Sequence, residues 1–350
     1  MESPNWRKKS LNLLGVLFFL YLFIFSLMLV KYSFSEIGTH VSKMTVENIS
    51  EINAFGLGWL LTLIMQSSGA ATSALISLNF AGIIGNVILI YMVLGTRIGT
   101  TITALFVALL VSAKRRDFRH GFEIGLANLV YAFPIALFMF FIEYFFSFFS
   151  KAGNYFLVSE IPFNINFLDK ITMPLLNLIK DIPGYLLALL GILFLMLSLK
   201  KLPVFMMHLW AKNFLRKKID RYFTKKSLSF LIGFIIALFL TSTSITITLL
   251  IPFIVSRIIN LKKVIPYLIG TNLGGVADVI IGGLVIGKTS LPAVFTYVSF
   301  SIIGLFWLFN TDLLFRITKF LSKRTLHISR KRAILFVLSF ILMAIILSFI

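Results

Sequence analysis

The sequence QSSGAAT at residues 66–72 is followed by GTRIGTT at residues 95–101, inside a long apolar stretch that runs from Phe55 to Ser112. The part from Phe55 to Leu78 is too long for one tidy crossing of a bilayer, for which a helix needs about 20 residues. Its polar cluster lies at the centre, so we predict a re-entrant hairpin whose tip stops midway through the membrane. Irregular backbone at that depth is tolerated where protein buries it or where it lines a wet cavity. The second motif predicts an interrupted helix.

The same pattern recurs at half the chain length. A shift of 175 residues superposes TSTSIT (241–246) on the first cluster and GTNLGG (270–275) on the second, without a gap. The shift also pairs Gly58 with Gly233, Ser67 with Ser242, Gly95 with Gly270, Thr96 with Thr271, and Gly99 with Gly274. We therefore predict one repeat over residues 11–147, a second over 184–322, and an extra C-terminal helix over 333–350.

Composition places the chain in a membrane. Of its 350 residues 59% are apolar and 13% are charged, against about 45–50% and about 25% in a soluble domain. It has no cysteine, which excludes a disulfide scaffold and a thiolate metal site. Together with the apolar stretches, these features predict an all-α polytopic membrane protein, a single transmembrane domain over residues 1–350 with seven spanning segments and two re-entrant hairpins. Five apolar runs outside the motifs are long enough to span: Leu11–Val30, Phe122–Phe146, Tyr185–Leu199, Leu291–Leu314 and Ala333–Ile350.

The net charge of +20 indicates orientation rather than a nucleic-acid partner. Of the 33 Lys and Arg residues, 26 lie in five blocks, while the intervening loops hold six basic and six acidic residues. The positive-inside rule places these blocks and the N-terminus in the cytoplasm, and the C-terminus on the other side of the cell (inner or plasma) membrane. The first repeat then starts inside and the second outside, so the two are inverted. The blocks are residues 7–9, 114–119, 200–226, 257–263 and 316–332.

Inverted repeats with interrupted helices are typical of secondary transporters, which bind substrate near the bilayer midplane where the repeats meet. A helix that begins at a hairpin tip directs free N–H groups and a positive dipole end into such a site. Donors from two facing tips suit a compact oxyanion, and carbonyl, hydroxyl and amide oxygens at the breaks suit Na⁺. A bundle whose Ser, Thr and Gly residues only pack helices together is the simpler alternative.

These paired motifs resemble the sodium/phosphate cotransporter family, whose repeats each carry a QSSS-type hairpin followed by a GANIGTT-like break. The resemblance covers about residues 55–110 and 230–285 and implies Na⁺ as the coupling ion, with no other cofactor. With the departures described next, we expect the substrate site to comprise Gln66, Ser67, Ser68, Arg97, Ser242, Thr243, Ser244 and Asn272. We expect the ion sites to comprise Thr96, Thr100, Thr101, Thr241, Thr271 and Asp278.

Three residues depart from the family pattern. Arg97 replaces an Asn, Thr241 replaces the Gln of the second motif, and Asp278 lies opposite Thr103 of the first repeat. Charges deep in a membrane helix cost about 2.5–3.5 kcal/mol on insertion scales and usually pair or line a functional cavity. Three interpretations of Arg97 stay open: an ion pair with Asp278, a donor to the anionic substrate, and a built-in replacement for one bound Na⁺.

The inverted repeats and the resemblance together imply a Na⁺-coupled symporter of inorganic phosphate that works by alternating access, with membrane lipids around it. One alternative keeps the fold but carries another small oxyanion or carboxylate, or transports its substrate without Na⁺ coupling. A second is a membrane-embedded lipid-modifying enzyme or an assembly factor, although no catalytic constellation is recognisable. The sequence is compatible with a homo-oligomer. Glu123, Glu143 and Asp312 lie near predicted helix ends, and we expect interfacial positions for them.

Overall fold

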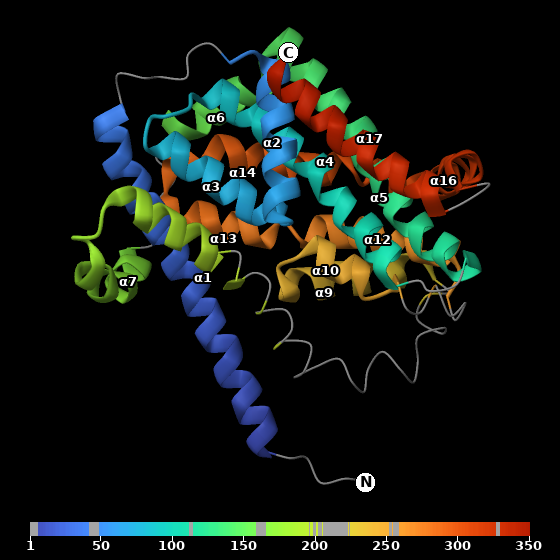
Figure 1. Ribbon diagram of the computed structural model, residues 1–350, viewed down its shortest axis with the longest axis horizontal. Coiled ribbons are helices and arrows are strands. Elements are labelled where there is room, and N and C mark those ends of the chain that lie inside the picture. The colour runs from blue at the N-terminus through green and yellow to red at the C-terminus, as the bar shows by residue number, and fades with distance from the viewer. Residues whose placement is uncertain are drawn as a thin grey trace.

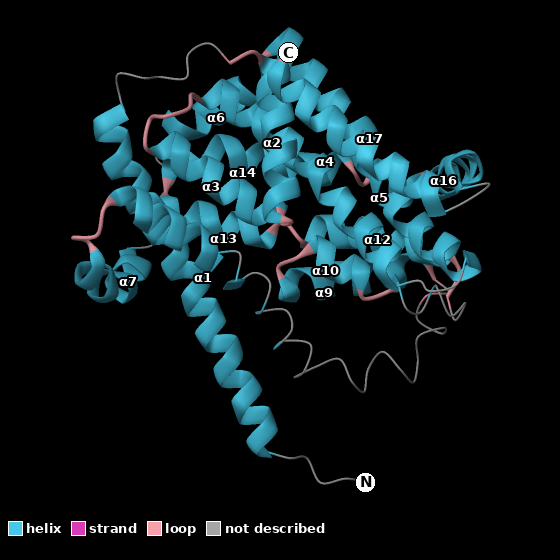
Figure 2. Ribbon diagram, viewed as in Figure 1, coloured by secondary structure: helices cyan, strands magenta, loops and turns pink. Residues whose placement is uncertain are grey.

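The computed structural model is helical, and within the residues that it describes there is no strand (Figure 2). The prediction of an all-α protein is therefore confirmed. The structure describes residues 6–41, 49–111, 115–158, 166–195, 197–198, 201, 205, 223, 225–251, 254, 259–326 and 330–350. The basic block 200–226 lies mostly outside these residues, as do parts of the blocks 114–119, 257–263 and 316–332.

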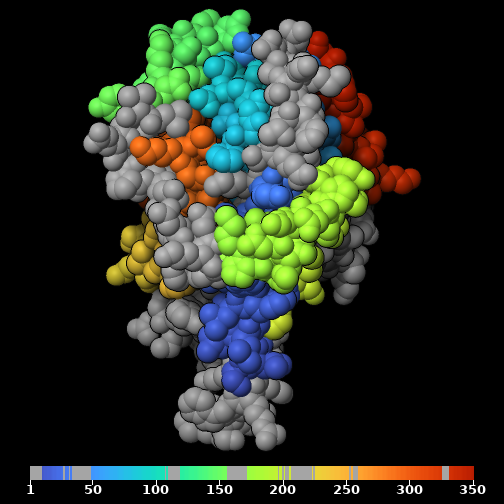
Figure 3. Space-filling model, turned by 90° about the vertical axis from the view of Figure 1, so that its left-hand side faces the viewer, coloured from blue at the N-terminus to red at the C-terminus, as the bar shows by residue number. Residues whose placement is uncertain are grey.

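The helices form a bundle from which α1 projects at its N-terminal end, while the C-terminus lies at the opposite end (Figure 1). From the side, α7 lies against α1 (Figure 3), where Phe25 and Leu29 pack with Leu176. The first half contains α1 (Trp6–Val41), α2 (Glu51–Met65), α3 (Ser68–Phe80), α4 (Asn86–Val111), α5 (Arg115–Phe146), α6 (Phe148–Val158) and α7 (Asn166–Ile179). The second contains α9 (Lys226–Leu240), α10 (Thr243–Thr248), α12 (Leu261–Gly274), α13 (Ala277–Ile286), the 3₁₀ turn η1 (Lys288–Ser290), α14 (Leu291–Ile303), α15 (Phe306–Phe309), α16 (Thr311–Leu326) and α17 (Arg330–Phe349).

Six helical segments of the described chain are long and apolar enough to cross a membrane, so the protein is a multi-pass membrane protein. The sequence predicts a seventh span at 185–199, where the structure has a shorter apolar helix, Gly184–Leu195, next to residues outside the described part. Two more apolar helices, α2 and α9, are also shorter than a span. The six are Ser10–Val30, Asn86–Phe106, Arg119–Phe146, Leu261–Ile286, Lys288–Phe309 and Lys331–Phe349.

In both halves, two helices meet at a two-residue turn of the same shape. α2 ends at Gln66 in the left-handed region (φ 54°, ψ 24°), and Ser67 is extended (φ −151°, ψ 117°) before α3. Between α9 and α10, Thr241 (φ 47°, ψ 36°) and Ser242 (φ −157°, ψ 111°) repeat these conformations. Each serine caps the helix that follows, because its Oγ accepts from the backbone N–H three residues later, at 3.2 and 3.3 Å. The 175-residue shift therefore matches backbone conformation at these turns.

The prediction of an interrupted helix is wrong in the first half. α4 runs without a break from Asn86 to Val111, through the whole of GTRIGTT. Its glycine at position 95 serves close packing instead, since a Cβ on Gly95 would overlap the Phe55 carbonyl oxygen of α2. In the second half a short non-helical turn does occur, between the end of α12 at Gly274 and the start of α13 at Ala277.

Three carboxylates are expected at the membrane–water interface, and two of them are instead buried within the protein. Glu123 accepts from Lys319 Nζ at 2.6 Å and from Ser322 Oγ at 3.0 Å, which ties α5 to α16. Glu143 accepts from the Phe149 backbone N–H at 2.7 Å, at the start of α6. Asp312 is exposed and lies 2.7 Å from Lys262 Nζ. Glu123 thus links α5 to α16 through an ion pair, and Glu143 links α5 to α6 through hydrogen bonds.

Matched glycines set the spacing of two helix pairs, α2 with α4 and α9 with α12. A Cβ on Gly58 of α2 would overlap the Met92 carbonyl oxygen of α4. A Cβ on Gly233 of α9 would overlap the Tyr267 carbonyl oxygen of α12, at positions shifted by 175 residues. Helix backbones approach this closely only where a small residue lies between them.

Substituting either glycine with alanine is expected to destabilise the protein. Gly58→Ala and Gly233→Ala force packed backbones apart, and we expect each to lower the free energy of unfolding by about 1–3 kcal/mol. Unfolding of the purified protein in detergent, followed by tryptophan fluorescence, measures this. Gly85→Ala is the control, because no atom lies within 4 Å of a Cβ at Gly85. Equal stability of all three variants would contradict the role of these glycines.

Candidate functional site

Arg97 lies near the middle of α4 and is 3% exposed. Its Nη2 donates to Asn272 Oδ1 of α12 and to Ser301 Oγ of α14, both at 3.3 Å. Asn272 is the residue that the 175-residue shift pairs with Arg97, so matched positions of the two halves contact each other here. Three helices thus converge on one guanidinium group.

Two aromatic rings of α14 support this guanidinium. The Arg97 Cζ atom lies 4.3 Å from the ring centroid of Tyr297 and 4.6 Å from that of Phe300. At these distances the ring faces attract a cation, and more strongly when water is excluded. The Nε atom of Arg97 is buried and has no hydrogen-bond partner. The guanidinium is therefore held by hydrogen bonds and by two ring faces, while its Nε donor has no partner.

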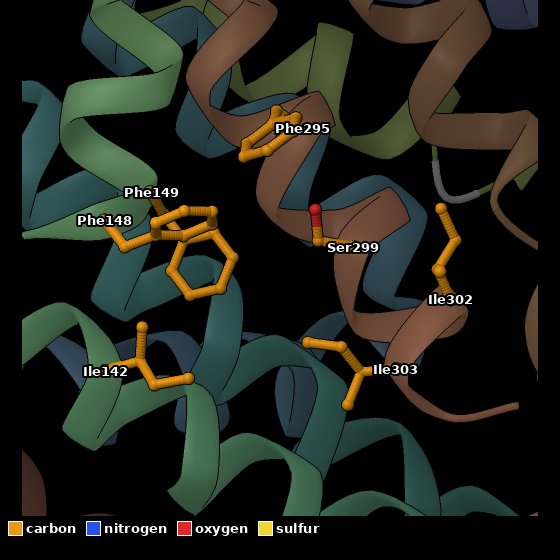
Figure 4. Close-up of a pocket in the computed structure, with 7 residues that line it drawn as sticks. All are labelled: Ile142, Phe148, Phe149, Phe295, Ser299, Ile302 and Ile303. Carbon is orange, nitrogen blue, oxygen red and sulfur yellow. The ribbon is translucent and has the colours of Figure 1, made fainter. Parts of the chain in front are cut away.

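α14 presents a different side to a neighbouring apolar cavity. Tyr297, Phe300 and Ser301 face Arg97, whereas Phe295, Ser299 and Ile302, at helical spacings of four and three residues, line a cavity of about 320 Å³ (Figure 4). Ser299 contributes the one hydroxyl among its lining side chains. An inorganic anion needs donors, so this cavity does not suit one. Its lining residues are Ile142, Phe148, Phe149, Phe295, Ser299, Ile302 and Ile303.

Amide and hydroxyl groups extend the polar network around Arg97. Asn272 Nδ2 donates to Asn128 Oδ1 of α5 and to the Leu268 carbonyl oxygen, both at 3.0 Å. Ser301 Oγ donates to the Asn272 carbonyl oxygen at 2.9 Å. All of these groups are buried, and satisfied buried networks fix side-chain positions. Asn272 is thereby oriented so that its Oδ1, an acceptor, faces the guanidinium.

The first hairpin turn joins this network through Tyr297. Ser68, the first residue of α3, places its Oγ 2.8 Å from Tyr297 Oη, and both side chains are buried. The N-terminal turn of α3 carries backbone N–H groups without partners inside the helix, together with the positive end of its dipole. The helix terminus and the guanidinium, two features that attract anions, are thus connected through one tyrosine.

Asp278 lies in the first turn of α13 and is 4% exposed. Its Oδ1 accepts from the Val279 backbone N–H at 2.7 Å, and its Oδ2 packs against Gly69, where a Cβ would overlap it. Among the described residues, no hydrogen bond or short ion pair joins Asp278 to Arg97, although the two opposite charges attract each other through space. The carboxylate is directed to the start of α3 instead, where the helix dipole favours a negative charge.

The threonines at the two predicted breaks form most of their hydrogen bonds within their own helices. Thr96, Thr100, Thr101 and Thr271 donate to carbonyl oxygens three or four residues earlier, at 2.7–2.9 Å. Two contacts reach another helix, since Thr72 Oγ1 lies 3.2 Å from Thr96 Oγ1, and Thr243 Oγ1 donates to the Thr271 carbonyl oxygen at 3.2 Å. Unbroken helix at these positions of α4 and α12 explains why the hydroxyls are not free.

The remaining predicted residues lie at the turns. Gln66 is exposed, Ser67 and Ser242 are half-buried caps, and Ser244 is buried in the first turn of α10. Thr241 is buried, and its Oγ1 has no hydrogen-bond partner. Of the fourteen residues predicted for the substrate and ion sites, three belong to the polar network around Arg97: Ser68, Arg97 itself and Asn272.

The sequence motifs missed three members of the network: Asn128, Tyr297 and Ser301. They lie on α5 and α14, which the Gly/Ser/Thr-rich stretches do not include. A signal was nevertheless present, because Asn128 and Ser301 are polar residues inside predicted apolar spans. Such residues usually face the interior of a helical bundle.

A sequence profile described as Na⁺/Pi-cotransporter matches residues 22–169 and 193–347. Sodium-dependent phosphate transport protein 2A of Oryctolagus cuniculus is 31% identical over 127 residues, which cover 34% of this chain and 20% of that protein. The Mus musculus 2A protein is 32% identical over 118 residues, 33% of this chain and 18% of its own length.

Sodium-dependent phosphate transport protein 2B of Homo sapiens is 30% identical over 115 residues, which cover 32% of this chain and 17% of that protein. The matched segment thus spans about a fifth of the length of these curated relatives. No solved structure matches the chain. The profile, in contrast, matches both halves and most of the chain, and so the chain belongs to the Na⁺/Pi-cotransporter family.

Proposed function

We propose that this protein is a Na⁺-coupled symporter of inorganic phosphate, with the anion bound beside Arg97. The observation that carries the proposal is a buried guanidinium that hydrogen-bonds to neutral oxygens and has no carboxylate in direct contact with it among the described residues. A buried charge is strongly destabilising unless an opposite charge compensates it. A bound phosphate supplies that charge, and Arg suits an oxyanion through charge-assisted hydrogen bonds.

Donors at the two turns complete the phosphate site. The start of α3 offers backbone N–H groups, and Gln66, Ser67 and Ser68 of the first turn add side-chain donors. Ser242, Thr243 and Ser244 do the same from the second turn. Asn272 holds the guanidinium in place through its Oδ1, 3.3 Å from Nη2. Arg97 thus supplies the charge, and neutral groups supply the directional hydrogen bonds.

Sodium binds, in this proposal, near Asp278 and the threonines of the predicted breaks. A hard cation prefers oxygen ligands, and a buried carboxylate supplies both an oxygen and a negative charge. Asp278 packs against Gly69, so a cation there lies close to the first turn. Thr96, Thr100, Thr101, Thr241 and Thr271 offer hydroxyl and carbonyl oxygens. Thr241 Oγ1 is already buried without a partner.

The two halves act as inverted repeats in a single transport domain, with the α2–α3 and α9–α10 turns as re-entrant hairpin tips. Matched turns, matched glycine contacts and the contact between Arg97 and Asn272 support this arrangement. The basic blocks support a cytoplasmic N-terminus. Alternating access then opens the central site to one side of the membrane and afterwards to the other.

Coupling to sodium follows from the charge of the substrate. An anion that enters a cell moves against the membrane potential, at about 2.3 kcal/mol per charge per 100 mV. Cations that enter together with it offset this work. Another small oxyanion, or transport without Na⁺, is an outcome of the uptake experiment below. A lipid-modifying enzyme is set aside, because the chain belongs to a family of transporters.

Proteoliposomes are expected to accumulate radiolabelled phosphate when an inward Na⁺ gradient is imposed. Arg97→Gln removes the charge and is expected to raise the KM for phosphate about 10–100-fold, since hydrogen bonds to charged groups contribute about 1.5–3 kcal/mol. Lys262→Gln is the control, because it removes a positive charge from an exposed side chain. Uptake that does not depend on the Na⁺ gradient would overturn the proposed coupling to Na⁺. An unchanged KM in Arg97→Gln would overturn the proposed binding of phosphate beside Arg97.

Asp278→Asn is expected to raise the Na⁺ concentration for half-maximal uptake about tenfold, because the cation loses a charged ligand. The KM for phosphate, measured at saturating Na⁺, stays close to that of the wild type. Asp312→Asn serves as control, since that carboxylate is exposed and paired with Lys262. The proposal for Asp278 fails if both variants show the Na⁺ dependence of the wild type.

A further inference from the structure

We infer that the Arg97 guanidinium acts as a built-in cation of the transport site and replaces one co-transported Na⁺ for each phosphate. This rests on the proposed function and concerns its stoichiometry. The inference starts from the contact between Arg97 and Asn272, which are 175 residues apart and occupy matched positions of the two halves. One half thus carries a charged side chain where the other carries a neutral amide.

The groups around the guanidinium are those that hold a cation. Asn272 Oδ1 and Ser301 Oγ each lie 3.3 Å from Arg97 Nη2, and the rings of Tyr297 and Phe300 lie 4.3 and 4.6 Å from its Cζ. Neutral amide and hydroxyl oxygens are also the ligands that hard cations accept. The guanidinium therefore occupies a place built for a positive charge.

This positive charge is not cancelled by hydrogen bonding to a carboxylate in the described part of the chain. Asp278 is directed to its own backbone at Val279 and to Gly69 at the start of α3. The Arg97 donor Nη2 is engaged with neutral oxygens, and Nε is buried without a partner. The charge is thus available to a bound anion, and an arginine keeps it at any physiological pH.

A fixed charge changes how many ions must bind together with the substrate. In a site lined only by neutral groups, each negative charge of phosphate must be compensated by cations that enter with it. Arg97 compensates one of these charges without moving across the membrane as cargo. The wild-type protein then needs one Na⁺ fewer per phosphate than a variant in which position 97 carries the neutral amide of position 272.

The experiment measures the Na⁺-to-phosphate ratio in proteoliposomes clamped at zero membrane potential. An outward phosphate gradient is fixed, and the opposing Na⁺ gradient at which net flux stops gives the ratio. We expect Arg97→Asn to raise the ratio by about one Na⁺ per phosphate relative to the wild type. The control Lys262→Asn, which removes an exposed charge, leaves it unchanged. An equal ratio in Arg97→Asn and wild type overturns the inference.

A second measurement uses only the wild-type protein, so it tests the inference even if Arg97→Asn does not fold. Inorganic phosphate is added to the purified protein in a mildly acidic, Na⁺-free choline buffer, in which most of it carries a single negative charge, and thermal stability is followed. We expect phosphate to stabilise the protein without Na⁺, because the guanidinium supplies the counter-charge. Stabilisation that requires Na⁺ overturns the inference but leaves the proposed function standing. If phosphate neither binds nor is taken up with Na⁺ present, the proposed function itself fails.

Discussion

One buried positive charge constrains the centre of this protein. A guanidinium removed from water is costly unless oxygens, aromatic faces or an anion replace its hydration. This requirement accounts for the convergence of α4, α12 and α14 on Arg97, and for the chain of hydrogen bonds through Asn272, Asn128 and Ser301. α14 serves two purposes at once, since one side carries these groups and the other lines an apolar cavity. Moving any of these helices would expose a charged or amide group to an apolar environment.

The two turns show how irregular backbone is made stable inside an apolar bundle. A left-handed residue reverses the chain, and a serine in extended conformation then caps the next helix. The left-handed region is uncommon for residues other than glycine, yet Gln66 and Thr241 both adopt it. The same unusual conformation occurs at both positions although the residues differ, so it does not depend on one local sequence. At each turn the first residue of the helix that follows, Ser68 or Thr243, is buried.

Much of this arrangement can be predicted from the sequence, and the exceptions have physical causes. The 175-residue shift locates both turns, and polar residues in apolar stretches identify Ser68, Arg97 and Asn272. The intact α4 could not be predicted, because glycines that break a helix and glycines that permit close packing look the same in a sequence. Whether a glycine breaks its helix or permits close packing depends on whether another backbone, here that of α2, lies against it. The burial of Glu123 depends in the same way on Lys319, nearly 200 residues later in the chain.

The contact between Arg97 and Asn272 has a consequence for how such a protein can evolve. In a symmetric pair of separate, identical subunits, a residue at this place would face its own copy. Two arginines would repel each other there, whereas two asparagines could form a hydrogen bond with each other. Joining the two copies in one polypeptide removes this restriction, because each half can then mutate independently. A charge at the contact between matched positions is thus open to a single chain with two independent halves and closed to a symmetric homodimer.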